Sequence, residues 1–167
     1  MIVIAEEEPA HRPAIAALHR AAFDGDDEAL LVERLHRDGL VVASLVALAG
    51  TDVVGHILFS ELGVEVDGRQ VKAAALAPVA VRPDRQRQGV GTRLITAGLS
   101  ALRDRQWSAV VVLGHASYYP RFGFSSMLAT RLSAPFRGES FMALELVPGA
   151  LNGDAGSVRY PPAFGMN

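Results

Sequence analysis

The segment best suited to chemistry is an arginine-rich turn that connects an apolar stretch to two closely spaced glycines. The turn and the start of the following segment read Gln86, Arg87, Gln88, Gly89, Val90, Gly91 and Thr92. Glycines at a helix start let a ligand approach bare backbone N–H groups, and the helix dipole makes that end attractive to anions. Arginines stand nearby at positions 82, 85, 87 and 93. The pattern therefore predicts a site for a phosphorylated ligand.

Two common phosphate-binding motifs do not fit this turn. A Walker loop needs a Gly-Lys-Ser/Thr ending, and that spacing is absent. A dinucleotide fingerprint needs a small residue where Leu94 stands, and an acidic residue after the next strand, where Gly114 and His115 stand. On the turn alone, one alternative stays open, in which the two glycines serve only tight packing.

The composition is that of one ordinary globular domain. The chain has 167 residues, half of them hydrophobic, and its net charge of −2 argues against general binding of nucleic acid. It has no cysteine, which excludes disulfides, thiolate catalysis and cysteine-based zinc sites. The histidines lack metal-ligand spacing, so no metal is expected. Without a signal peptide or a long apolar run, we expect one cytoplasmic domain over residues 1–167, away from membranes.

Apolar periodicity predicts the elements before the turn. Helical spacing covers 14–23, and a second helix follows candidate N-caps at Asp26 and Asp27, with Leu31 and Leu35 on one face. The expected strands are 2–5, 45–49, 53–59 and 71–81. Asp67-Gly68 is a strong hairpin signal because both residues tolerate positive φ. These strands predict an antiparallel meander that leads into the turn.

The pattern after the turn changes to that of a crossover. Residues 89 to about 105 have helical spacing, and the apolar run 109–113 is typical of a strand buried on both faces. Strand, helix and strand of this length predict a parallel pair. A short turn at 118–122, a strand at 141–147 and an extended tail from about residue 150 complete the chain. The expected fold class is α/β (mixed α+β), with helices on both faces of a mixed sheet.

Residues 86–91 resemble the Q/R-x-x-G-x-G/A signature of the GCN5-related N-acetyltransferases, the GNAT superfamily, and the order of expected elements is also that family's. Further motifs resemble its YhbS-like subgroup of predicted acetyltransferases: V-G-H-I-L-F-S at 54–60, L-A-P-V-A-V at 76–81, Y-Y-P-R-F-G-F at 118–124 and V-R-Y-P-P-A-F at 158–164. The resemblance covers nearly the whole chain. It implies the acyl-CoA N-acyltransferase fold, a central mixed sheet of about seven strands flanked by about four helices.

The resemblance also implies a ligand, acetyl-CoA, and positions that bind it. In the family the amides of the glycine turn hold the pyrophosphate, which here places Gln86 to Thr92 against it. The preceding strand pairs with the pantetheine arm through Val79, Ala80 and Val81. Further candidates for cofactor contact are Ser117, Tyr118, Arg121 and Phe122. For Ser117 helix capping is the favoured alternative, and Arg121 could equally cover the surface.

Catalytic roles follow from the same resemblance. Transfer to an amine releases a thiolate, and family members commonly place a general-acid tyrosine four residues before a glycine, as Tyr119 precedes Gly123 here. The family's frequent glutamate at the start of the cofactor strand is missing, because 73–76 read Ala-Ala-Ala-Leu. Glu61 and His115 are the substitutes considered for the base. Glu61 could instead be a solvated strand-end carboxylate, and His56 a core histidine.

The function expected is acetyl transfer from acetyl-CoA to a primary amine of a small molecule or protein, by direct transfer with Tyr119 as general acid. A non-catalytic acyl-CoA-binding module or sensor is the alternative, and a structural protein whose turn binds nothing is a third. The expected partners are acetyl-CoA and an unidentified amine, without nucleic acid or membrane, and a homodimer is left open. The sequence does not indicate which amine is the acceptor.

Overall fold

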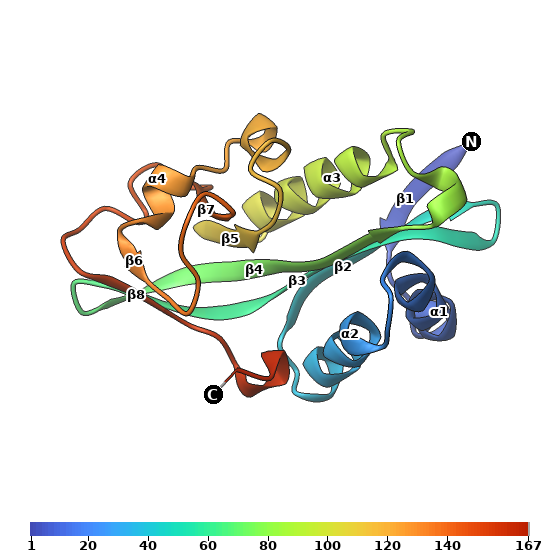
Figure 1. The fold of residues 1–167 in the computed structure, drawn as a ribbon, viewed down its shortest axis with the longest axis horizontal. Coiled ribbons are helices and arrows are strands. Elements are labelled where there is room, and N and C mark those ends of the chain that lie inside the picture. The colour runs from blue at the N-terminus through green and yellow to red at the C-terminus, as the bar shows by residue number, and fades with distance from the viewer. Residues whose placement is uncertain (167) are drawn as a thin grey trace. The chain divides into compact units, whose positions relative to one another are not determined.

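A computed structural model describes residues 1–166 as one mixed sheet with helices (Figure 1). The α-helices in this range are α1 (Arg12–Ala22), α2 (Asp27–Arg37), α3 (Val90–Asp104) and α4 (Ser126–Ala129). The strands are β1 (Ile2–Glu6), β2 (Val41–Ala49), β3 (Asp52–Val66), β4 (Arg69–Val81), β5 (Ala109–Leu113), β6 (Leu132–Ser133), β7 (Phe141–Glu145) and β8 (Gly156–Arg159). Short 3-10 turns cover Pro9–His11, Pro83–Arg85, Tyr119–Phe122 and Pro162–Phe164.

The sheet confirms the expected fold class. Its strand order is β1-β2-β3-β4-β5-β7, with β8 paired to β3 and β6 paired to β8. β4 and β5 are parallel, as the crossover pattern predicted, whereas β1 with β2, β2 with β3, and β5 with β7 are antiparallel. β3 pairs with β2 over Asp52–Ser60 and with β8 over Gly63–Val66. The tail, expected to be merely extended, therefore supplies a strand.

The chain divides into two compact units. The first comprises Met1–Ser60 and Ala77–Leu102, and the second comprises Glu61–Leu76 and the chain from Arg103 onward. The first unit contains β1, α1, α2 and β2 together with most of α3. The second contains β5 to β8 with α4. Each unit has its own buried side chains.

In the first unit, alternate residues of β3 face different helices. His56 bonds to His19 of α1, whereas a Cβ added at Gly55 would lie 2.9 Å from Leu94 of α3. Phe59 also faces α3, where a Cβ at Gly98 would come 2.3 Å from its ring. This alternation is the period of two expected of a strand buried on both faces. It places α1 and α2 on one face of β2 and β3, and α3 on the other (Figure 1).

The buried face of α2 differs slightly from the expected one. Ala29, Val32 and Leu35 are buried, whereas Leu31 is only half-buried. Leu31, which was expected on the same face as Leu35, lies at the edge of this stripe, because spacings of three residues centre the stripe on Ala29, Val32 and Leu35. Asp26 occupies the N-cap position as expected. Its carboxylate, however, accepts a hydrogen bond from Arg20 Nε at 2.8 Å and caps no backbone N–H.

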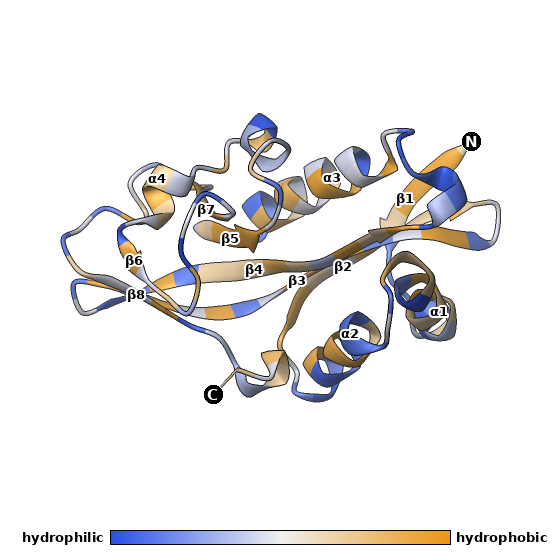
Figure 2. Cartoon of the chain, in the orientation of Figure 1, coloured by the Kyte–Doolittle hydropathy of each residue, from blue (hydrophilic) through white to orange (hydrophobic). Residues whose placement is uncertain are grey.

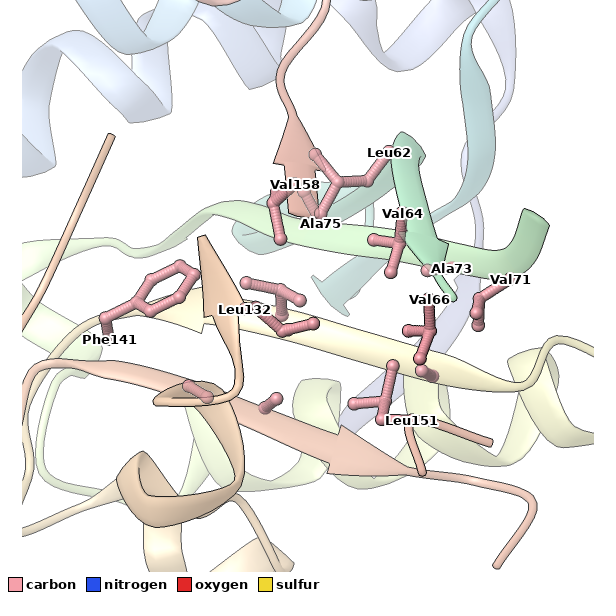
Figure 3. Close-up of a cluster of buried hydrophobic side chains, with 14 residues drawn as sticks. Leu62, Val64, Val66, Val71, Ala73, Ala75, Leu132, Phe141, Leu151 and Val158 are labelled. Atoms are coloured by element: carbon pink, nitrogen blue, oxygen red, sulfur yellow. The ribbon is translucent and has the colours of Figure 1, made fainter. Parts of the chain in front are cut away.

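The core of the second unit lies between the far ends of the hairpin strands and the C-terminal elements. Figure 3 shows side chains from β3, β4 and β8 packed with Leu132, Phe141 and Leu151. Residues 62, 64 and 66 of β3 and 71, 73 and 75 of β4 belong to this cluster, and this period of two shows that alternate side chains of each strand face it.

The hairpin at this end is confirmed. Asp67 and Gly68 adopt φ of 50° and 83°. The Asp67 carboxylate also accepts hydrogen bonds from the backbone N–H groups of Asp154 and Ala155, at 3.1 and 2.9 Å. These bonds hold the segment that enters β8, so one turn residue both bends the hairpin and anchors the tail.

Candidate functional site

The glycine turn before α3 is a loop closed by its own side chains. The Gln86 carboxamide donates to the carbonyl of Val81 at 3.0 Å, and that of Gln88 donates to the carbonyl of Asp84 at 3.3 Å. Arg87 and Gly89 adopt φ of 64° and 82°. Residues 86–89 are exposed, and Figure 2 shows this loop as a hydrophilic stretch before the more apolar α3. The loop is thus held in one shape while its surface remains open.

The start of α3 fits a phosphate. The first N–H groups of a helix have no acceptor within the helix, and the dipole adds partial positive charge there. The first turn of α3 contains no acidic residue that would compete for these groups. A Cβ at Gly89 would meet nothing within 4 Å, so space is open beside this backbone. Backbone donors, positive potential and space therefore coincide at residues 86–91.

Two of the four nearby arginines have partners elsewhere in the first unit. Arg82 Nε lies 2.6 Å from Asp84 Oδ1, and the Arg93 guanidinium donates to the carbonyl of Ile2 at 2.9 Å. Arg87 is exposed within the loop itself. Guanidinium groups that are already paired have less to offer a ligand, so Arg82 and Arg93 are weaker candidates for contact with a phosphate than the backbone of the loop.

β4, the strand before the loop, extends beyond the residues that pair with its parallel neighbour β5. β4 pairs with β5 from Ala73 to Leu76 only. Val79, Ala80 and Val81 lie beyond this ladder, with Ala80 buried and the two valines half-buried. Strand backbone outside a ladder can pair with an extended ligand.

Two adjacent tyrosines, Tyr118 and Tyr119, lie in the second unit, and Tyr119 is the buried one. The residue is 6% exposed and its ring lies against Tyr118 and Phe124, with centroids 5.2 and 5.7 Å away. A Cβ at Gly114 would come 2.4 Å from the same ring. Burial, with a smaller contribution from Tyr118, raises the pKa of Tyr119 to about 12. The phenol is therefore protonated at neutral pH, as a proton donor must be.

The residues around Tyr119 have mostly structural contacts. The Arg121 guanidinium lies 4.5 Å from the Tyr118 ring centroid, and its Nε donates to the Tyr118 carbonyl. Phe122 packs edge-on against Tyr118, and Gly123 adopts φ of 100°. Ser117 is exposed and does not cap the short 3-10 turn, whose N-cap is Tyr118. The expectation of a cap at Ser117 was wrong because the turn begins one residue later.

The two candidates for a base, both in the second unit, lie on exposed positions. Glu61 is exposed and lies within β3 rather than at its end, because β3 continues to Val66. His115 is exposed, and its carbonyl accepts from the N–H groups of Tyr118 and Tyr119 at 3.0 and 3.2 Å. His115 therefore helps to shape the tyrosine turn through its backbone. Residues 73–76, which lack a carboxylate, are buried.

Sequence reasoning missed a buried polar chain in the first unit. His19 Nε2 lies 2.8 Å from His56 Nδ1, and His56 Nε2 lies 2.8 Å from Ser44 Oγ. Ser44 Oγ donates to Glu7 Oε1 at 2.7 Å, and His36 Nε2 lies 3.0 Å from Glu7 Oε2. His56 is the core histidine that the sequence suggested, with 0% exposure. The partners of this chain are up to 37 residues apart, so no local pattern could reveal it.

The pKa values of three side chains in this buried polar chain are shifted from their ordinary values. Burial alone would raise the pKa of Glu7, but hydrogen bonds from His56 and Ser44 and the charge of His36 lower it to about 2. Burial lowers the pKa of His19 to about 3, with His56 contributing in the same direction. Burial also lowers the pKa of His56, against the attraction of Glu7. At neutral pH, Glu7 in this buried polar chain is therefore ionised, and His19 and His56 are neutral.

Among residues 1–166, no group of three or more His, Cys, Asp or Glu side chains is arranged to hold a metal ion. Likewise, no helix in the described part of the chain is long and apolar enough to cross a membrane.

The mixed sheet with a glycine turn before α3 matches a known family of acyl-transferring enzymes. A family model described as an acetyltransferase (GNAT) domain matches residues 5–127. The chain is 36% identical over 166 residues to the uncharacterized N-acetyltransferase YhbS of Escherichia coli K12, covering 98% of each chain. The protein therefore belongs to the GNAT family of acetyltransferases, as the sequence motifs predicted.

Solved structures agree with this assignment. The crystal structure of YhbS from Escherichia coli in complex with CoA matches with a TM-score of 0.89, covering 99% of this chain and 92% of that one. A GNAT family acetyltransferase from Brucella melitensis, in complex with acetyl-CoA, is 32% identical with a TM-score of 0.81, covering 98% of both chains.

Proposed function

We propose that this protein transfers an acetyl group from acetyl-CoA to a primary amine of a small molecule or protein. The observation that carries the proposal is the loop at residues 86–91, whose open backbone at the start of α3 fits a pyrophosphate. The relatives crystallised with CoA and acetyl-CoA support the same ligand. Val79 to Val81 offer backbone groups to the pantetheine arm, and Gln86 to Thr92 hold the phosphates.

Tyr119 is the proposed proton donor. Acetyl transfer forms a C–N bond, breaks the C–S bond and leaves a thiolate that must gain a proton. A phenol with a pKa of about 12 is fully protonated at neutral pH and can also stabilise the developing thiolate by a hydrogen bond. The packed ring, fixed against Gly114 and Phe124, limits where this hydroxyl can point. Tyr118, Phe122, Ser117 and Arg121 are proposed to line the cofactor.

One observation favours a second candidate function, an acyl-CoA-binding module without catalysis. The buried residues 73–76 carry no carboxylate, and the substitutes Glu61 and His115 are exposed. A protein that kept the loop but lost its base would bind acetyl-CoA and release no CoA.

Two measurements separate these functions. Isothermal titration calorimetry with acetyl-CoA tests the loop, and Gly91→Glu is expected to abolish binding because it adds bulk and negative charge beside the phosphates. Release of CoA thiol across a panel of amines then tests catalysis. Saturable binding without thiol release for any amine would favour the binding module. An absence of saturable binding would reject both functions.

Tyr119→Phe tests the proton donor. Its turnover is expected to fall by roughly 10²–10⁴-fold, the range for loss of a general acid, with acetyl-CoA affinity largely kept. Tyr160→Phe is the matched control, because burial raises the pKa of Tyr160 to about 12 as well. If both variants keep the turnover of the unaltered protein, Tyr119 has no part in proton transfer.

A further inference from the structure

A pocket lies between the two N-terminal helices of the first unit. α1 and α2 line an open volume of about 480 Å³. Aliphatic side chains form much of its wall, namely those of Pro13, Ile15, Ala16, Ala29 and Val32. Ile15 and Val32 are buried, at 1% and 6% exposure, so they form its floor. A pocket of this size suits a small molecule, and this wall suits one with an aliphatic body.

The polar side chains of the pocket are mostly basic. They are those of Arg12, Arg20, Glu33, His36 and Arg37. Arg12 and His36 both contact Glu7, at 3.3 and 3.0 Å, so the start of α1 lies beside the end of α2. Arg37 is the last residue of α2, which places it at the same end of the pocket. Three arginines against one glutamate favour an anion as the ligand.

Arg12 and Arg37 are each held by a single nitrogen. Arg12 Nε lies 3.3 Å from Glu7 Oε2, and Arg37 Nε lies 3.1 Å from Asp38 Oδ1. Within residues 1–166, neither guanidinium makes a hydrogen bond through its terminal Nη groups. The ion pairs offset part of the positive charge, but they also orient both side chains. The Nη groups that remain can bind a carboxylate through parallel, charge-assisted hydrogen bonds.

The pocket is distinct from the glycine loop of the same unit. None of the residues that line it belongs to positions 86–91. α1 and α2 lie on one face of β2 and β3, whereas α3, which the loop precedes, lies on the other face (Figure 1). A ligand in the pocket therefore need not displace a ligand at the loop.

We propose that the pocket between α1 and α2 binds a small aliphatic carboxylate. The Nη groups of Arg12 and Arg37 hold the carboxylate, and the chain packs against Ile15, Ala16 and Val32. Affinity comes from burial of the methylene groups, and the choice of an anion comes from the two guanidiniums. This second site does not depend on acetyl transfer, because no step of that reaction enters the argument.

Isothermal titration calorimetry with butanoate, hexanoate and octanoate tests the pocket, with CoA present in excess to occupy the loop. Affinity is expected to rise roughly two- to fourfold with each added methylene. Octanoate should bind saturably with a Kd below about 10 mM. Hexanol has the chain of hexanoate without the negative charge, and it should bind roughly tenfold more weakly than hexanoate.

Three variants assign the binding to this pocket. Arg12→Gln and Arg37→Gln should each weaken octanoate binding by roughly fivefold or more. Arg34→Gln is the matched control, because Arg34 is an exposed arginine of α2 that does not line the pocket, and its affinity should stay within about twofold. Ala16→Leu fills the pocket with a good helix former and keeps every charge, so it should weaken octanoate binding at least roughly tenfold.

NMR of the unaltered ¹⁵N-labelled protein locates the ligand without any variant. Octanoate should shift backbone amide signals of α1 and α2 and leave those of residues 86–91 unchanged. Shifts centred on 86–91 would overturn the proposal, as would a failure to saturate below about 10 mM. Equal affinity for hexanol and hexanoate, or equal affinity of Arg37→Gln and Arg34→Gln for octanoate, would overturn it as well.

Discussion

Acid should destabilise this protein through His19 before its carboxylates begin to protonate. The folded state holds the pKa of His19 at about 3, whereas the unfolded chain has the ordinary value of 6.5. Below pH 6.5 the unfolded state therefore binds a proton that the folded state rejects, and stability falls as pH drops from 6.5 toward 3. These two pKa values imply a loss of about 2 kcal/mol at pH 5 relative to pH 7.5.

The neighbours of His19 add to this effect in known directions. The lowered pKa of His56 acts with the same sign as that of His19. Glu7 has a folded pKa of about 2 against 4.5, so its stabilisation is present above pH 4.5 and is lost below it. Between pH 7.5 and 5 the histidines therefore dominate. For a protein of this size, 2 kcal/mol corresponds to a shift in Tm of roughly 4–8 °C.

Urea unfolding followed by circular dichroism at pH 7.5 and 5.0 measures this loss. His19→Gln keeps a donor to His56 but cannot titrate, so the difference between the two pH values should shrink by about 2 kcal/mol. His11→Gln, which removes a histidine near the surface of the same unit, serves as the control and should retain the full difference. If His19→Gln also retains the full difference, the burial of a neutral His19 is not what makes the fold acid-sensitive.

Three further substitutions test packing and the loop. Gly98→Ala should destabilise the protein by about 1–3 kcal/mol in urea unfolding, because its Cβ would overlap the Phe59 ring; a gain in stability would contradict that contact. Gly114→Ala should displace the Tyr119 ring and lower turnover at least tenfold with little change in acetyl-CoA affinity, and unchanged turnover would show that the ring tolerates movement. Gly89→Val, a β-branched residue at φ of 82°, should weaken acetyl-CoA binding at least tenfold by calorimetry, and unaltered affinity would mean that the loop does not bind the ligand.

Local sequence predicted those parts of the fold that local chemistry determines. The Asp67-Gly68 hairpin follows from two residues that tolerate positive φ, and the loop at 86–91 from glycines before an amphipathic helix. The parallel pairing of β4 and β5 followed from an unbroken apolar run after a helix. In each case the residues that decide the structure are neighbours in the chain.

The features that sequence reasoning missed depend on distant partners. β8 forms because the tail pairs with β3, with Val64 opposite Val158, and nothing in the tail's own pattern distinguishes this strand from an extended segment. The local pattern around His19 gives no sign of its polar role, because its partner His56 is 37 residues away. Glu61 was placed at a strand end because the continuous length of β3 was not recognised.

The measurement that tests the central claim most directly is release of CoA thiol from acetyl-CoA by the unaltered protein and by Gly91→Glu, across a panel of small amines and peptides. The predicted result is saturable, amine-dependent thiol release by the unaltered protein and its loss in Gly91→Glu. Saturable binding of acetyl-CoA without amine-dependent release, or equal release by both proteins, would contradict acetyl transfer at the 86–91 loop.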